Sequence, residues 1–158
     1  IENRVRFVLE VAVAVADAIG KDRLGIRLSP FGIFNDMPHY DTMEADYAYL
    51  TERLSALGLL YLHIVDHSAM GAPQVPDSMK QTMRRLFTGA IILSGGYDAE
   101  RAQRDIDAGL GDLVAVGRDF LANPDLPARW RSGSALNKPD PDTFYTPGPK
   151  GYTDYPAM

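Results

Sequence analysis

Cysteine is absent from the 158 residues, which excludes disulfides and thiolate metal sites and fits a reducing, cytoplasmic setting. Long apolar runs are also missing, since none approaches the roughly 20 residues of a membrane span. An excess of basic charge is missing too, because the formal net charge is −5. These absences argue against a membrane protein and against a nucleic-acid partner.

The composition is that of an ordinary globular protein, with 46% hydrophobic and 23% charged residues. A chain of this length can bury one sizeable core, so we predict a single domain over residues 1–158. The segment 134–158 is rich in Pro, Gly and aromatic residues without periodicity, and we expect an irregular tail there. The chain opens on "IENRVRF" inside a helical pattern and without an initiator Met, so we expect further residues upstream.

Helical and strand patterns alternate along the chain. The helical periodicity predicts helices at residues 2–19, 44–58, 77–87, 98–111 and 123–133. Short apolar runs predict strands at residues 23–30, 59–66, 89–96 and 112–118. We expect Gly20 to end the first helix, and Asp77 and Asp98 to cap two others. The apolar face expected on the first helix consists of Phe7, Val8, Val11, Val15, Ala18 and Ile19.

Strict alternation of strands and helices predicts an α/β fold with a parallel sheet and right-handed crossovers. The strands are apolar runs, as expected for strands buried on both faces. Four such units can form an open doubly wound sheet or half of a (β/α)8 barrel. Both architectures bind ligands at the carboxyl ends of the strands.

Polar and glycine residues gather at those strand ends. The third strand ends at Ser94, Gly95 and Gly96, and the fourth ends at Gly117 and Arg118. Glycines let backbone N–H groups approach an anion, and a following helix adds positive potential. We therefore expect a phosphate site in which arginine is a charge-assisted ligand. The alternative is a tight turn at the paired glycines and an ion pair of the arginine with its neighbour, Asp119.

Other polar residues allow two interpretations. Arg27 lies inside the first strand and either meets a ligand's negative charge or pairs with a carboxylate such as Asp66. His63, within the second strand, is interpreted as a hydrogen-bonded core residue, whereas His39 and His67 lie in loops. The spacing of these histidines predicts no metal site, and no motif supports acyl transfer.

The motifs "RLSP", "SGGY", "VGRDFLANPDL" and "FYTPGPKGYTDYP" resemble the Old Yellow Enzyme family of flavin ene-reductases. The resemblance runs the whole length and is strongest to the bacterial branch that reduces N-ethylmaleimide, enones and nitro esters. It implies a (β/α)8 TIM barrel that binds FMN and uses NAD(P)H to reduce electron-poor alkenes or nitro compounds. Within that barrel the chain would supply strands five to eight, with an N-terminal half-barrel in the same or a separate chain.

The resemblance also implies roles for residues that match the family motifs. Arg27 would contact the flavin near N1 and the C2 carbonyl, where a positive charge stabilises the reduced cofactor. Ser94, Gly95 and Gly96 would hold the FMN phosphate through backbone amides.

Gly117 and Arg118 would form a second phosphate loop, and Tyr145 would border the substrate pocket. The family's catalytic residues belong to the first half of the barrel, so we expect none in this chain. The alternative function is a non-catalytic half-barrel fragment or assembly module that binds a phosphorylated ligand. A weaker alternative is half of another phosphate-binding barrel, such as a sugar-phosphate isomerase.

Overall fold

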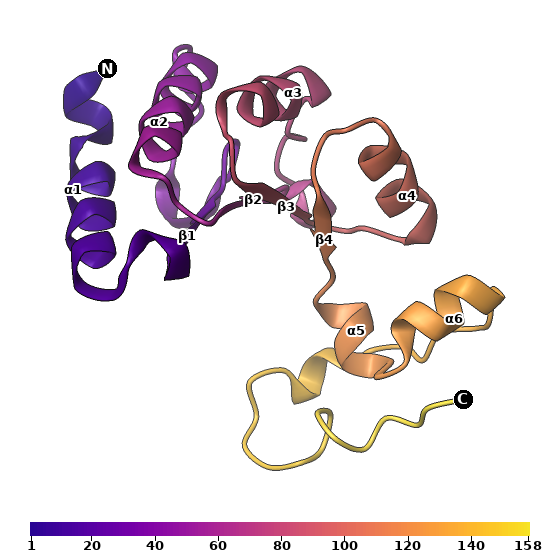
Figure 1. Ribbon diagram of the computed structural model, residues 1–158. Helices are drawn as coiled ribbons and strands as arrows, with labels where there is room; N and C mark the ends of the chain where they lie inside the picture. Colours follow the sequence, from indigo (N-terminus) through magenta and orange to yellow (C-terminus); the bar gives the residue numbers. More distant parts are fainter. The chain divides into compact units, whose positions relative to one another are not determined.

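A computed structural model describes residues 1–158, which form two compact units, Ile1–Ala115 (unit 1) and Val116–Met158 (unit 2). Figure 1 shows the elements of each unit. Unit 1 contains a four-stranded sheet and four helices, whereas unit 2 contains two short helices and an irregular tail. None of the helices is both long and apolar enough to cross a bilayer.

Unit 1 confirms the predicted alternation of helices and strands. The helices are α1 (Glu2–Ile19), α2 (Met43–Leu57), α3 (Asp77–Leu86) and α4 (Ala99–Asp107). The strands are β1 (Gly25–Leu28), β2 (Tyr61–Val65), β3 (Ala90–Ser94) and β4 (Leu113–Ala115). Single 3-10 turns occupy Lys21–Arg23, Phe34–Asp36 and Ser68–Met70. Each strand is shorter than predicted, because the predicted ranges included flanking loop residues such as Pro30, Gly95 and Gly117.

The strand order decides between the two predicted architectures. All neighbouring strands are parallel and follow the chain order β1-β2-β3-β4, with partners such as Leu62 and Ile91 in register. The helices of unit 1 lie on one face of the sheet (Figure 1). A doubly wound sheet reverses its strand order and carries helices on both faces. Consecutive order with one covered face is instead the arrangement of a barrel segment.

The two faces of the sheet differ in burial. The residues that face the helices, including Leu62, Ile64 and Ile91, are almost completely buried. On the opposite face Arg27 is exposed, and Leu113 keeps 56% of its surface accessible. The expectation that both faces are buried is therefore wrong for this unit, since only the face that the helices cover is buried.

The apolar face predicted for α1 is also wrong. Val5, Ala12 and Ala16 are the buried residues, whereas Phe7 is 74% exposed and Val11 46% exposed. Arg4 of α1 donates two hydrogen bonds, of 2.6 and 2.7 Å, to Asp46 of α2. These bonds hold the pKa of the Asp46 carboxyl below its ordinary value. Periodicity located an apolar stripe, but the neighbouring helix covers a different face.

Two of the three predicted helix ends are confirmed. Gly20 is the C-cap of α1, and Asp98 caps α4 by accepting a 2.8 Å hydrogen bond from the Arg101 N–H. The prediction for Asp77 is wrong, because the N-cap of α3 is Pro76 and Asp77 is already helical. The Asp77 carboxylate accepts instead from Nζ of Lys80, at 2.9 Å. The buried lysine competes successfully with the backbone for this carboxylate.

Unit 2 begins with α5 (Arg118–Ala122) and α6 (Leu126–Ser132), followed by a 3-10 turn at Pro141–Thr143. The prediction of a helix at 123–133 is confirmed as α6. Arg118 was predicted to end the fourth strand, but it is the first residue of α5. The two helices are separated at Asn123 and Pro124, since a proline lacks the N–H that would continue α5.

Two buried side chains anchor the tail of unit 2. The Asn123 amide donates to the carbonyl of Asn137 and accepts from its N–H, at 3.1 and 2.7 Å. Arg129 donates to the carbonyls of Ala135 and Pro156, at 2.6 and 3.0 Å. The tail predicted to be irregular is thus held by side chains of the "ANPDLPAR" segment, which gives that motif a structural role.

We expect Asn123→Ala to lower the free energy of unfolding by about 2–3 kcal/mol, because it leaves buried backbone groups without partners. Urea denaturation measures this loss, and limited proteolysis reports whether the tail is released first. Lys138→Ala, at an exposed position of the same tail, is the matched control and should cost less than about 0.5 kcal/mol. Equal stability of the two variants would contradict the anchoring role.

Candidate functional site

The turn after β3 brings the backbone of Gly95 against the end of β2. Gly95 has φ +118°, and a Cβ at this position would lie 1.8 Å from the carbonyl oxygen of Asp66. Gly96 has φ +64°, and its Cβ would lie 2.7 Å from that of Ala69. Both glycines are therefore required by the close approach of two loops at the carboxyl edge of the sheet.

This turn leaves two backbone donors available. The N–H groups of Gly96 and Tyr97 donate to no acceptor within unit 1. They lie directly before α4, whose first turn adds the positive end of a helix dipole. Consecutive free N–H groups next to a helix N-terminus suit a phosphate. A side chain on Gly96 would also leave less room for a ligand to reach these N–H groups. The residues present therefore fit a phosphorylated ligand.

An ion pair between Asp66 and Arg101 stabilises the turn at Gly95 and Gly96. Asp66 accepts hydrogen bonds from the N–H of Ser68 at 2.8 Å and from Nη2 of Arg101 at 2.9 Å. Arg101 also donates through Nη1 to the carbonyl of Gly95, at 2.9 Å. The partner of Asp66 is thus Arg101, and the alternative of an ion pair with Arg27 is wrong. Sequence reasoning missed Arg101, because its contact crosses from α4 to the end of a neighbouring strand.

Arg27 and His63 lie on the face of the sheet that no helix covers. They are register partners on β1 and β2, and Arg27 makes no ion pair or side-chain hydrogen bond in unit 1. Nε2 of His63 shares a 2.8 Å hydrogen bond with Oγ of Ser94, as predicted, but the residue is half-buried and does not belong to the core. Burial, and then the charge of Arg27, lower the pKa of His63 below its ordinary value. Both effects favour the neutral form of the His63 imidazole beside Arg27.

The hydroxyl of Ser94 is engaged inside the sheet. Besides His63, it contacts the carbonyl of Ile64 at 3.4 Å. The Ser94 carbonyl accepts from the N–H of Asp66 at 2.8 Å. The side chain of Ser94 thus links β3 to β2. The free N–H donors lie after Ser94, in the backbone of Gly96 and Tyr97.

The second predicted loop lies in unit 2. Gly117 has a negative φ of −94° and no atom within 4 Å of an added Cβ, so local packing does not require a glycine. Arg118 is exposed and forms no ion pair or hydrogen bond within its unit, which rules out the pair with Asp119 there. Tyr145 is 97% exposed, with its N–H donating to the hydroxyl of Tyr152 at 2.8 Å.

The loop after β1 contacts the loop after β2 through one aromatic pair and holds a second pair within itself. The ring of His67 lies edge-on to Phe34, with centroids 4.9 Å apart, and the ring of His39 lies 5.4 Å from that of Phe31. Phe31 and Asn35 adopt positive φ angles of 61° and 57°, which cost energy for residues with side chains. The two loop histidines thus help to shape a strained loop.

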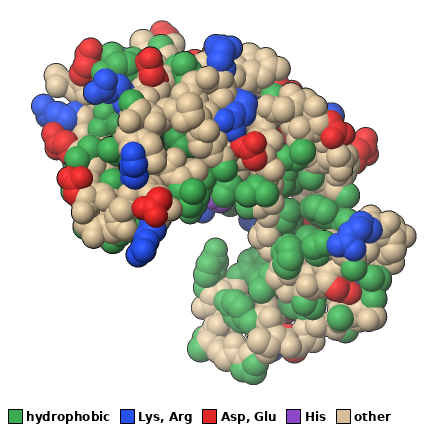
Figure 2. All heavy atoms as spheres, viewed as in Figure 1, with side chains coloured by type: hydrophobic (Ala, Val, Ile, Leu, Met, Phe, Trp, Pro, Cys, Tyr) green, Lys and Arg blue, Asp and Glu red, His purple; other side chains and the backbone are tan.

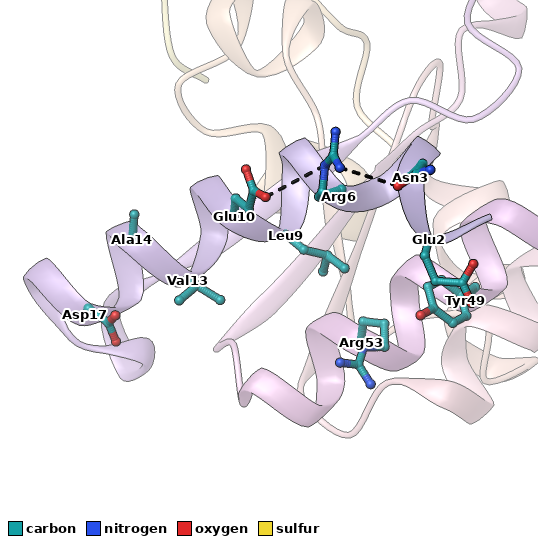
Figure 3. Close-up of a pocket in the computed structure, with 10 residues that line it drawn as sticks. All are labelled: Glu2, Asn3, Arg6, Leu9, Glu10, Val13, Ala14, Asp17, Tyr49 and Arg53. Carbon is teal, nitrogen blue, oxygen red and sulfur yellow. Dashed lines mark hydrogen bonds and ion pairs between the residues drawn. The ribbon is translucent and has the colours of Figure 1, made fainter.

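A groove of about 590 Å³ lies on the outside of unit 1, between α1 and α2 (Figure 3). Its walls come from helix residues such as Arg6, Leu9 and Val13 of α1 and Arg53 of α2. No strand or strand-end residue lines it, so the groove is separate from the candidate site. Figure 2 shows basic and acidic side chains interspersed over the face of unit 1 in view, without a continuous patch of either charge.

A parallel sheet in consecutive strand order, with helices on one face, is the arrangement of a segment of an α/β-barrel protein. The chain belongs to the NADH:flavin oxidoreductase / NADH oxidase family, whose sequence profile matches residues 1–137.

Individual relatives support this assignment. The chain is 44% identical to 12-oxophytodienoate reductase 2 of Arabidopsis thaliana, over 100% of the chain and 43% of that protein. Among solved structures, morphinone reductase is 47% identical, with a TM-score of 0.92 over 99% of the chain and 42% of that protein. An old yellow enzyme homologue from Zymomonas mobilis is 32% identical, with a TM-score of 0.88 over 99% of the chain and 44% of that protein. The chain spans about half the length of the curated relatives it matches.

Proposed function

We propose that the chain is the second half, strands five to eight, of an FMN-dependent ene-reductase barrel. An N-terminal half-barrel, in the same or a separate chain, would cover the open face of the sheet and bring the catalytic residues. Family membership supports the proposal, as does the chain's span of about half of its relatives. The substrates would be electron-poor alkenes, including enones and maleimides, or nitro compounds, as in the bacterial branch that the motifs resemble.

The observation that carries the proposal is the pair of N–H groups at Gly96 and Tyr97 that have no acceptor in unit 1. They lie in a turn where a side chain at Gly95 or Gly96 would clash with the neighbouring loop. In unit 1, Ser94, Gly95 and Gly96 would hold the FMN phosphate through the backbone. In unit 2, Gly117 and Arg118 would form the second phosphate loop. The exposed, unpaired guanidinium of Arg118 suits such a charge-assisted contact.

Arg27 would place its positive charge beside the flavin ring. Its lack of a protein partner supports this role, because a strand arginine without a carboxylate is available to a ligand. When bound, FMN supplies the two-electron carrier between NAD(P)H and the substrate. Tyr145, exposed in unit 2, would border the substrate.

Reconstitution with FMN tests the function. The full-length protein, purified and incubated with FMN, should gain flavin absorbance and should oxidise NADH or NADPH anaerobically when an enone or N-ethylmaleimide is added. A colourless protein with no flavin absorbance after incubation would contradict the proposal. Binding of phosphate compounds without enone reduction would favour the non-catalytic half-barrel instead.

We expect Arg118→Ala to weaken FMN binding by roughly 10- to 100-fold, because a hydrogen bond to a charged group contributes about 1.5–3 kcal/mol. Quenching of flavin fluorescence during titration measures the dissociation constant. Arg131→Ala, at an exposed arginine of α6 in the same unit, is the control and should leave it unchanged. Equal FMN affinities of the two variants would contradict the role assigned to Arg118. In Arg118→Ala, the ratio of activities on different alkenes should remain that of the wild type.

A further inference from the structure

We infer that Arg101 is a positioning residue that holds the Gly95–Gly96 turn in the conformation that presents its N–H groups to a phosphate. The inference rests on the proposed function, because it concerns the same turn. The side chain of Arg101 joins α4 to the ends of two neighbouring strands, β2 and β3. It donates to the Gly95 carbonyl and to Asp66, both at 2.9 Å, while its own N–H is capped by Asp98.

The bond to Gly95 fixes the direction of one peptide group. The peptide that links Gly95 and Gly96 is trans, like every peptide of the chain. In a trans peptide the C=O and the following N–H point in opposite directions. Because Arg101 binds the Gly95 oxygen, the N–H of Gly96 is turned away from Arg101 and toward the open side of the turn, where it has no protein acceptor.

A glycine pair needs such a restraint more than other sequences do. Gly95 and Gly96 both adopt positive φ, and glycine has more backbone freedom to lose than any other residue. A turn that reorders on binding weakens the ligand's affinity by the cost of ordering, and a preorganised turn does not. The Arg101 fork is rigid and planar, so one side chain restrains both strand ends at once.

Arg101 is itself held in place from behind. Its guanidinium carbon lies 4.2 Å from the centre of the Tyr97 ring, and its Nε lies 3.9 Å from Oδ2 of Asp105. Oδ2 of Asp105 accepts a 2.8 Å hydrogen bond from the Tyr97 hydroxyl. The guanidinium is therefore surrounded by a carbonyl, two carboxylates and a ring. It acts on the phosphate through the backbone of Gly95 and Gly96, not as a ligand.

The test compares FMN with riboflavin, which has the same ring system and lacks the phosphate. In the full-length protein we expect Arg101→Met to reduce the preference for FMN over riboflavin about tenfold, while the riboflavin dissociation constant stays within about twofold of wild type. A general loss of structure would weaken both ligands alike. Arg104→Met is the matched control, because Arg104 lies on the same helix and pairs with Asp105 but does not contact Gly95.

Arg101→Lys keeps a cation beside Asp66 but has no fork to hold the Gly95 carbonyl at the same time. We expect this milder variant to fold and to lose the FMN preference several-fold. An unchanged preference in Arg101→Lys or Arg101→Met overturns the positioning role while wild-type FMN binding, and with it the proposed function, still stands. A wild-type protein that binds FMN no better than riboflavin overturns both.

Discussion

Replacing Gly95 with alanine is expected to destabilise the protein by about 2–6 kcal/mol. The new Cβ would lie 1.8 Å from the carbonyl oxygen of Asp66, a backbone atom that cannot rotate away. Overpacking of this kind costs about 1–3 kcal/mol. The φ of +118° adds a conformational cost of about 1–3 kcal/mol for a residue with a side chain. A typical domain has about 5–15 kcal/mol of stability in total, so this loss threatens folding itself.

Gly109→Ala separates the two contributions. Gly109 also has a positive φ, of +68°, but no atom lies within 4 Å of an added Cβ. This variant should show only the conformational cost, about 1–2 kcal/mol. Urea denaturation of both proteins gives the free energies of unfolding. If Gly95→Ala were no less stable than Gly109→Ala, the two strand ends could not approach as closely as the structure has them.

The sequence predicted the elements of unit 1 well, because their signals are local. The helix periodicity of residues 2–19 coincides with α1, and Gly20 and Asp98 end or begin helices through bonds to residues within four positions. Strand existence was equally clear from short apolar runs. The choice between a barrel segment and a doubly wound sheet depended on strand order, which no local pattern encodes.

Failures arose where a residue's partner lies far away along the chain. Phe7 belongs to a helical apolar stripe, yet periodicity does not say which face a neighbouring helix covers. Asp66 was one of two possible partners considered for Arg27, the other being a ligand, but it binds Arg101, 35 positions away. Asp77 is the exception, because its carboxylate binds the buried amine of Lys80, only three positions away in the same helix. The errors at Phe7 and Asp66 concern contacts that depend on how the elements are packed.

The glycines of the two predicted phosphate loops look alike in sequence and differ in structure. Gly95 is required by a close backbone approach and a positive φ, so its presence alone does not indicate a ligand. Gly117 has a negative φ and open space around it, so the fold of its unit gives no reason for glycine. The stronger indication of a ligand in the first loop is the pair of unbonded N–H groups, which only the structure reveals.

We expect Asp105→Leu to lower the free energy of unfolding by about 3–5 kcal/mol, as is typical when one partner of a buried ion pair is removed. Asp105 and Lys80 are each 1% exposed, with Nζ and Oδ2 3.7 Å apart. The substitution leaves the lysine with only the largely exposed carboxylate of Asp77, and it removes the acceptor of the Tyr97 hydroxyl. Urea denaturation at pH 7 measures the loss.

The pH dependence of the same variant gives a second measurement. Burial opposes ionisation of Asp105, but the hydrogen bonds from Tyr97 and Arg104 and the charge of Lys80 together hold its pKa below the ordinary 3.8. A carboxyl whose pKa is lower in the folded state stabilises the fold fully above its unfolded pKa. That contribution disappears as the pH falls through the folded value. The stability difference between wild type and Asp105→Leu should therefore be constant near neutral pH and shrink below pH 3.8.

Two further variants separate the charge from the space it fills. In Lys80→Met/Asp105→Leu both charges are replaced by apolar groups of similar length, so most of the lost stability should return. Asp77→Asn removes only the exposed carboxylate and should cost less than about 1 kcal/mol. A double variant as unstable as Asp105→Leu would show that the damage comes from the Tyr97 hydroxyl, Arg101 and Arg104, the other groups that bind Asp105, and not from an isolated buried lysine.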